Sequence, residues 1–267
     1  MNKYSRERHK EQFWVEIIAY YFGQLIDVDV PKTFISIDQK NENGALSEWF
    51  YRNDNSAKKA FSSSNINYVD KYISGYQFMN AKIRGYDLEK GEQHNLYTLF
   101  EIMTEEKVGN WLELWIKYFV FDALIGNTDR HQDNWGILNR KKGKYLSPAF
   151  DNGTSMGYEI LEENILKFND ENYLEKYINK GYHHIKLSQT DQTHVKHLQL
   201  IEELINRYNK KAIRIIREVL SFDNKNVEEI LNYLVKFNTI IPLTEKRADF
   251  ILRLIIKRKN MLMRLLK

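Results

Sequence analysis

The sequence predicts an α+β fold with two unequal lobes, a small one that contains strands and a large one that is mainly helical. Residues 33–38 alternate between apolar and polar positions, as strands do, and residues 44–51 read as another strand after a turn at 41–44. After residue 153 the apolar spacing is helical almost throughout. Between these regions lie two polar loops, residues 126–134 and 148–153, which are typical of a site that carries chemistry.

Composition sets limits on the class of protein. The chain has 267 residues, of which 43% are hydrophobic, enough for one large domain or two lobes with a real core. Cysteine is absent, which excludes disulfides and thiolate zinc sites. We find no apolar run near 18 residues and no signal-peptide pattern, so we expect no transmembrane segment. The cytoplasm is the simplest location, with secretion to a host cell left open.

Positive charge is concentrated in the last helix that the sequence predicts, residues 243–266. The net charge of the chain is +4, yet residues 244–267 hold 8 basic and 2 acidic residues and so contribute +6, which leaves 4 − 6 = −2 for the remainder. We therefore expect no direct nucleic-acid binding. An amphipathic basic helix either lies on an anionic membrane or docks on its own core, and we favour docking, with Lys246, Arg247, Arg253, Lys257 and Lys259 in solvent.

The small lobe is predicted to cover residues 1–55. A one-sided apolar stripe from Phe13 to Tyr21 indicates a helix that ends near Gly23 and carries Glu16. Polar residues 53–68 then mark a boundary between lobes.

The large lobe is predicted to cover residues 56–267. Helical patterns run from 95 to 104 and from 110 to 125, and the second is rich in aromatic residues, as core helices are. Residues 135–138 and 145–147 read as two strands of a hairpin joined by a turn at 139–144. This hairpin should fold the chain back so that the two polar loops meet.

Spacing within the two loops matches a phosphoryl-transfer site. Asn134 follows Asp129 by five positions, and Asp151 follows Asn134 by 17, with Gly153 two positions later. In such sites one Asp holds the acceptor hydroxyl, and the Asn and the second Asp hold metal between phosphates. Hard oxygen ligands suit Mg²⁺. The plainer interpretation is that these residues form turns in two surface loops.

The stretch Asn127-Thr128-Asp129-x-His131-x-x-Asn134, followed by Phe150-Asp151, resembles the HipA-like serine/threonine kinases, the toxin kinases of bacterial toxin–antitoxin pairs. The resemblance spans most of the chain. It implies a protein-kinase-like fold of two lobes with a truncated small β lobe. The stretch Asp129-Arg130-His131-Gln132-Asp133-Asn134 also looks like the Asp-Arg-His-x-x-Asn loop of phosphoinositide 3/4-kinases.

The resemblance implies a role for each site residue. Asp129 would be the catalytic base, Asn134 and Asp151 would bind Mg²⁺, and Lys3, braced by Glu16, would contact the phosphates of ATP. The remaining nucleotide-binding residues would be Glu48 and Phe50, through backbone groups that hold adenine, together with His131 and Phe150. The implied reaction is transfer of the ATP γ-phosphate to Ser or Thr of a protein substrate.

One feature departs from the resemblance: the first glycine is Gly23, so no Gly-rich phosphate loop precedes Lys3. The chain is then shortened, or a partner chain supplies the missing strands, or the kinase is degenerate. We also expect a HipB-like helix-turn-helix antitoxin as a candidate partner. The alternatives to a protein kinase are a non-catalytic pseudokinase-like binding module and a phosphoinositide-type lipid kinase.

Several polar residues stay without an assigned role. Asp133 is expected to be a solvated loop carboxylate. His183 and His184 lie in a segment that the resemblance covers, and His194 and His197 are expected three apart on one helix. A metal site is conceivable there, but we favour polar surface histidines.

Overall fold

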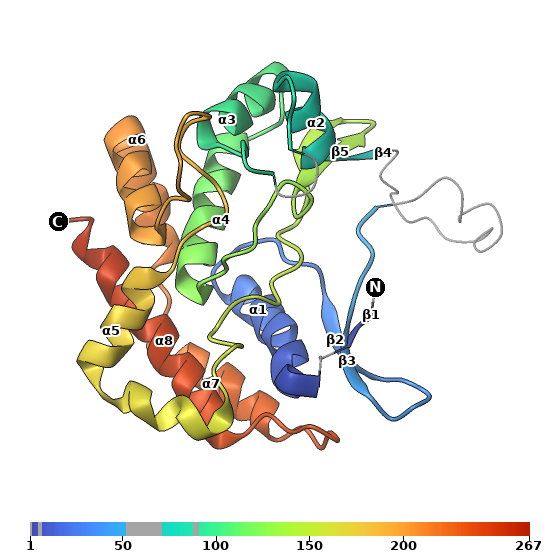
Figure 1. Cartoon of the computed structure of the whole chain (residues 1–267), viewed down its shortest axis with the longest axis vertical. Coiled ribbons are helices and arrows are strands. Elements are labelled where there is room, and N and C mark those ends of the chain that lie inside the picture. The colour runs from blue at the N-terminus through green and yellow to red at the C-terminus, as the bar shows by residue number, and fades with distance from the viewer. Residues whose placement is uncertain (1, 5–6, 52–70, 88–90) are drawn as a thin grey trace.

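The computed structural model describes residues 2–4, 7–51, 71–87 and 91–267, with side chains from residue 9 onward. It is a mixed α+β structure, mostly helical with two small sheets. Figure 1 shows both sheets on one side of the molecule and the C-terminal helices on the other. The predicted fold class is confirmed at this level, whereas the predicted boundary at 53–68 falls within residues 52–70, which lie outside the described residues.

The first sheet has the order β1-β3-β2 and is antiparallel throughout. Its strands are β1 (Asn2–Tyr4), β2 (Thr33–Ile37) and β3 (Asn43–Ser47). The third strand is shorter than predicted, because pairing stops at Ser47. From there the aromatic side chains of residues 49–51 pack against one another and against the rings of Tyr72 and Phe150, and the chain leaves the sheet.

Helix α1 (Phe13–Leu25) follows the short 3-10 helix η1 (Glu7–Gln12) and covers the first sheet. Its predicted apolar stripe is buried, with Trp14 and Ile17 each 1% exposed. Near its end a Cβ on Gly23 would lie 2.5 Å from Val30, so the close return of the chain toward β2 requires glycine there. Glu16 is buried on the same helix, where a carboxylate needs a partner.

The predicted hairpin is confirmed with slightly different bounds. Strands β5 (Gly136–Arg140) and β6 (Gly143–Leu146) pair antiparallel, and β4 (Lys71–Ser74) adds to β5 to give the order β4-β5-β6. Helix α2 (Gly75–Lys82) follows β4 directly. A Cβ on Gly75 would meet the ring of Trp135 at 2.2 Å, so this glycine lets helix and hairpin approach.

Helix α4 (Trp111–Ile125) runs through the hydrophobic core and leads into the first polar loop. From Trp115 to Ile125 every residue is buried except Lys117. The remaining helices are α3 (Leu96–Glu105), η2 (Glu162–Asn169), α5 (Glu171–Lys180), α6 (His197–Val219), α7 (Asn224–Val235) and α8 (Glu245–Arg264). Of these, α3, α6 and α8 make the main contacts with α4.

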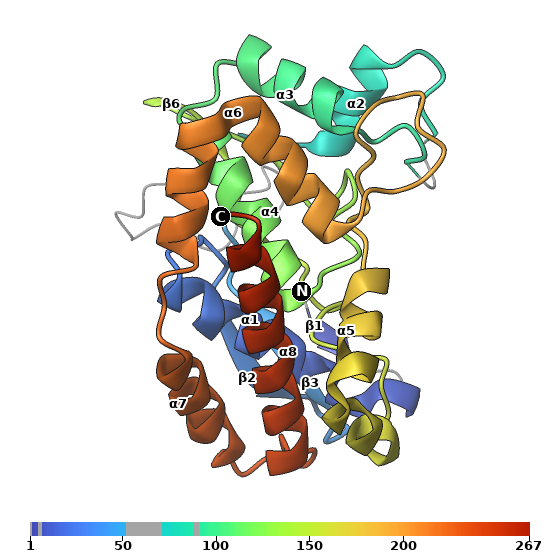
Figure 2. The same ribbon diagram turned by 90° about the vertical axis from the view of Figure 1, so that its left-hand side faces the viewer.

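Helix α8 docks on the protein's own core, in agreement with the interpretation that we favoured. Figure 2 shows it between α7 and α5. Phe250 and Leu254 are fully buried on it. Arg247 corrects the prediction of a solvated basic face, because it is only 4% exposed and donates to the carbonyls of Gly157 and Ile160. Among the described residues no helix is long and apolar enough to cross a membrane.

Truncation of Leu254 should therefore unfold the protein more easily. Leu254→Ala removes a fully buried side chain and should lower the free energy of unfolding by about 2–5 kcal/mol. Urea denaturation followed by circular dichroism measures this change. Met263→Ala is the matched control, because Met263 is 43% exposed on the same helix and should change stability by less than about 0.5 kcal/mol. Equal effects of the two substitutions would show that α8 is not docked as described.

Candidate active site

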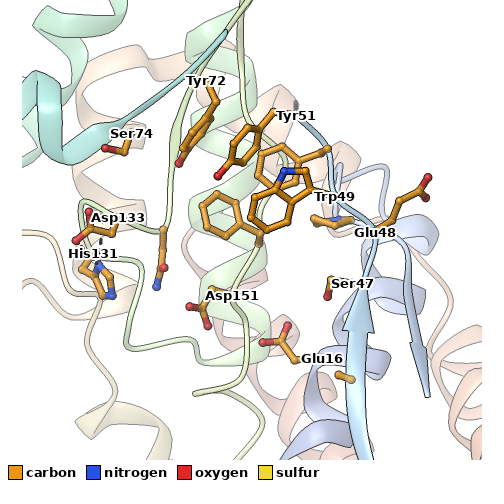
Figure 3. Close-up of a pocket in the computed structure, with 15 residues that line it drawn as sticks. Glu16, Ser47, Glu48, Trp49, Tyr51, Tyr72, Ser74, His131, Asp133 and Asp151 are labelled. Carbon is orange, nitrogen blue, oxygen red and sulfur yellow. Dashed lines mark hydrogen bonds and ion pairs between the residues drawn. The ribbon is translucent and has the colours of Figure 1, made fainter. Parts of the chain in front are cut away.

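A cavity of about 400 Å³ lies between the first sheet with α1 and the polar loops beside the hairpin. Figure 3 shows carboxylates of Glu16 and Asp151 directed into one end of it and aromatic rings at the other. Its walls thus come from both predicted lobes. The lining residues are Glu16, Pro31, Ala45, Ser47, Glu48, Trp49, Phe50, Tyr51, Tyr72, Ser74, His131, Asp133, Asn134, Phe150 and Asp151.

The first polar loop begins at Gly126, where α4 ends in the left-handed conformation with φ +69°. A Cβ there would lie 2.2 Å from the guanidinium of Arg258. The chain then turns at residues 127–129, where the backbone N–H of Asp129 donates to Asn127 Oδ1 at 3.0 Å. The Asn134 side chain closes the loop by donating from Nδ2 to the Asp129 carbonyl at 2.7 Å. This bond fixes the amide, so that its oxygen is the group left for a ligand.

Arg130 joins the two polar loops from inside the protein. Its side chain is 1% exposed, and it donates to both carboxylate oxygens of Asp122 on α4, at 3.1 and 2.8 Å. The same guanidinium donates to the Phe150 carbonyl and, at 2.7 Å, to Asn152 Oδ1 in the second loop. Such a bidentate pair with two further acceptors holds its neighbours in one geometry.

Asp122 carries the charge that makes this burial of Arg130 tolerable. Burial by itself favours the neutral acid, but Arg130 and His183 hold the pKa of Asp122 below its usual value. His183 Nδ1 accepts from the Ile185 N–H, so the ring proton is on Nε2, which lies 3.2 Å from Asp122 Oδ2. Asn127 Nδ2 also donates to Asp122. The carboxylate is therefore ionised and fully hydrogen-bonded.

The second loop places Asp151 and Asn152 on opposite sides of the backbone. Asp151 has φ +59°, an uncommon conformation for a residue with a side chain, and lines the cavity. Asn152 is buried, and its N–H donates to Glu16 Oε2 at 3.1 Å. One continuous set of contacts thus runs from Asp122 through Arg130 and Asn152 to Glu16. Backbone strain of this kind is common where a side chain must point at a ligand.

An aromatic cluster forms the other end of the cavity. Tyr51 stacks on Tyr72 with ring centroids 4.4 Å apart, and Phe50 lies 5.1 Å from Phe150. Tyr72 donates to the Trp135 carbonyl, which holds its ring against the hairpin. The sequence predicted Phe50 and Phe150 here but missed Tyr51 and Tyr72. Residues 68–84 are rich in aromatic residues in the sequence, but this pattern does not show which other rings they contact.

Most of the predicted site residues come together in this cavity. Those that line it are Glu16, Glu48, Phe50, His131, Asn134, Phe150 and Asp151. Asp129 is not among the lining residues, but it lies next to them, because its carbonyl binds Asn134 and its carboxylate lies 3.9 Å from His131 Nε2. Lys3 pairs through its backbone with Ala45, a lining residue, while its side chain lies outside the described residues.

The histidines correct a second prediction. His183 and His197 are 0% and 6% exposed rather than on the surface, and His194 precedes α6 rather than sharing it with His197. His94, which had no predicted role, is 1% exposed and accepts from Trp135 Nε1. In the described part of the chain, no three His, Cys, Asp or Glu residues are arranged to hold a metal ion.

Removal of the Arg130 charge should destabilise the whole protein. Arg130→Met leaves Asp122 ionised and buried without its main partner, and should cost about 3–5 kcal/mol in the free energy of unfolding. Urea denaturation at pH 7 measures this cost. Arg207→Met is the control, because Arg207 stacks on Tyr97 at an exposed position on α6 and should cost less than about 1 kcal/mol. A small effect of Arg130→Met would contradict the linking role of this residue.

Stability should fall as the solution becomes acidic. Burial and neighbouring histidines lower the pKa of His184 to about 3, and burial lowers the pKa of His197 to about 3. The unfolded state takes up these protons near pH 6.5 and the folded state does not, so stability is complete above about pH 7 and is lost toward pH 4.

His184→Phe isolates one such proton. It should reduce the slope of unfolding free energy against pH, between pH 5 and 6, by up to about 1.4 kcal/mol per pH unit. Urea denaturation at several pH values gives both slopes. Identical slopes for the variant and the wild type would show that His184 is protonated in the folded protein.

Comparisons with known proteins identify a family and similar folds. The model of the family described as "HipA-like C-terminal domain" matches residues 2–226. Among solved structures, the Helicobacter pylori proinflammatory kinase CtkA is similar over 100% of this chain and 85% of that one, with a TM-score of 0.74 and 18% identity. No curated protein is significantly similar.

A second similar structure is HipA of Shewanella oneidensis, from a complex with HipB and operator DNA. It has a TM-score of 0.57 and 13% identity, over 95% of this chain and 55% of that chain. Identities this low establish the shared fold only, whereas the family match covers most of the chain. The protein belongs to the HipA-like C-terminal domain family.

Proposed function

We propose that this protein is a kinase that transfers the γ-phosphate of ATP to a Ser or Thr hydroxyl of a protein. The observation that carries the proposal is that Asn134 and Asp151, 17 positions apart in sequence, line one cavity with Glu16. The loops that carry them are fixed by Arg130, so this meeting does not depend on two mobile segments. Family membership and the similarity in fold to CtkA support the same activity.

The residues at this end of the cavity fit Mg²⁺. An amide oxygen from Asn134 and a carboxylate from Asp151 are hard ligands, and Mg²⁺ in nucleotide sites uses one or two such groups plus phosphates and water. A cage of three or more carboxylates is not needed, which agrees with the lack of one among the described residues. When bound, the ion neutralises charge on the phosphates.

The aromatic end of the cavity suits the base of the nucleotide. Phe50, Phe150, Tyr51 and Tyr72 offer apolar faces for a planar ring. The Glu48 N–H already donates to the Lys32 carbonyl at 2.7 Å, so Glu48 would read the base through its own carbonyl. Phe50 would contribute its backbone N–H. On this view residues 1–55 form a small lobe over the nucleotide, and residues 56–267 form the large lobe.

The phosphates would extend from the base toward Glu16 and Asp151. Lys3 is in β1, beside Ala45 of the cavity wall, and would contact the phosphates from there, with Glu16 as its brace. Glu16 is in turn fixed by the Asn152 N–H. His131 borders the same cavity and would face the terminal phosphate.

Asp129 would serve the acceptor. The acceptor oxygen forms a bond to the γ-phosphorus, the bond from that phosphorus to the bridging oxygen breaks with its electron pair on ADP, and the acceptor proton passes to the Asp129 carboxylate. The Asp129 side chain is 42% exposed, so a protein segment can reach it from solvent.

We also propose that this protein has a partner protein. The Shewanella HipA structure contains HipB, and a HipB-like antitoxin, or a chain that completes the first sheet, would suit this protein if it acts as a toxin. For its cellular compartment we propose the cytoplasm, on the sequence features given above.

Radiolabelled ATP tests the proposed reaction. With Mg²⁺ and a bacterial lysate as acceptor, the wild type should label protein, and Asp129→Asn should reduce the rate by about 10²–10⁴-fold because it removes the base. Asp151→Asn should abolish labelling and also weaken Mg²⁺-dependent ATP binding in calorimetry. Asp191→Asn, in a loop outside the cavity, is the control.

The alternatives predict other outcomes of the same experiment. Label in phosphoinositide vesicles but not in protein would identify a lipid kinase, and ATP binding without transfer to either would identify a pseudokinase-like module. Full activity of both Asp129→Asn and Asp151→Asn would overturn the assignment of the site.

A further inference from the structure

His131 lies between two carboxylates of its own loop. Its Nε2 is 3.9 Å from Asp129 Oδ1, and its Nδ1 is 3.7 Å from Asp133 Oδ2. The three side chains are partly open to solvent, at 42%, 28% and 51% exposure for Asp129, His131 and Asp133. Figure 3 shows His131 and Asp133 together at the edge of the cavity, away from Glu16. His131 therefore lies both at the cavity and beside the Asp129 carboxylate.

The backbone decides which nitrogen of His131 carries the proton. The N–H of Asp133 donates to His131 Nδ1 at 3.1 Å, so the lone pair of a neutral ring is on Nδ1 and the hydrogen is on Nε2. The ring thus presents an N–H to the Asp129 carboxylate. A separation of 3.9 Å is longer than a hydrogen bond, but contacts of this kind commonly shorten when a substrate binds.

Contacts with other histidine rings, which do not line the cavity, support His131. His184 packs edge-on against it with centroids 5.7 Å apart, and His184 in turn contacts His194 at 4.9 Å and His94 at 6.0 Å. His94 is anchored on Trp135 of the hairpin by the indole N–H. These contacts restrict the tilt of the His131 ring, which a solvated loop side chain would not require.

We propose that His131 is a positioning residue whose Nε2–H orients the Asp129 carboxylate toward the acceptor hydroxyl. The inference rests on the proposed kinase function and extends it, since the site assignment above gives His131 only a place near phosphate. An N–H directed at Asp129 Oδ1 limits rotation of the carboxylate and so sets the direction from which it meets the acceptor hydroxyl. The plainer interpretation, in which His131 only fills space against His184, predicts that any ring of similar size would serve.

Three substitutions separate orientation from packing. His131→Phe keeps a ring against His184 but removes the N–H, and kcat should fall by about 10²-fold, within the range for a general-base contribution, while the KM for ATP changes less than about threefold. His131→Gln restores an N–H donor at similar reach and should recover at least about tenfold of that loss. Asp191→Asn, in a loop outside the cavity and away from these rings, should leave kcat unchanged.

Nitrogen-15 NMR of the histidine side chains gives a readout that needs no activity. In the wild type the His131 resonances should report the Nε2–H tautomer, and Asp129→Asn should shift the Nε2 signal of His131 while leaving that of His194 in place. If the wild type transfers no phosphate, the proposed function fails. The tautomer of His131 still tests whether its Nε2–H faces Asp129. An Nδ1–H tautomer, or a His131→Phe enzyme with wild-type kcat, would overturn the proposal.

Discussion

The site depends on the buried ion pair between Arg130 and Asp122. Both side chains are within 1% of full burial, which is costly for charges unless every hydrogen-bonding group is used. Arg130 meets this requirement, because besides Asp122 it donates to the Phe150 carbonyl and to Asn152. Asn152 in turn donates to Glu16. Two loops and the helix of the first sheet are therefore held by one guanidinium. A more hydrophobic pair would remove the burial cost, but it would not position three segments at once.

The general arrangement was predictable from the sequence because it follows from periodicity and spacing. The apolar stripe of α1, the aromatic core of α4 and the hairpin between the two loops were each expected. The position of Asn134 and Asp151 in one cavity was also expected, since a hairpin returns the chain to where it began. These features depend on local patterns that a single segment of sequence contains.

The rest depended on contacts between distant segments. Nothing local shows that Arg130 is buried, because its partners Asp122 and Asn152 are identified only once the loops are folded. Arg247 was expected in solvent for the same reason, as its acceptors lie about 90 positions earlier in the chain. His183 and His197 looked polar in the sequence, yet they fill the space beside α4. Side chains that are polar and buried are those that sequence patterns describe least well.

The central claim is that Asn134 and Asp151 share one metal ion beside the nucleotide. A crystal structure with Mn²⁺ and a non-hydrolysable ATP analogue tests it directly, because manganese scatters anomalously and replaces Mg²⁺ at oxygen ligands. We predict an anomalous peak between the Asn134 amide oxygen and the Asp151 carboxylate, with the adenine against Phe50 and Phe150. A nucleotide bound elsewhere, or a metal ion that contacts neither residue, would contradict the account.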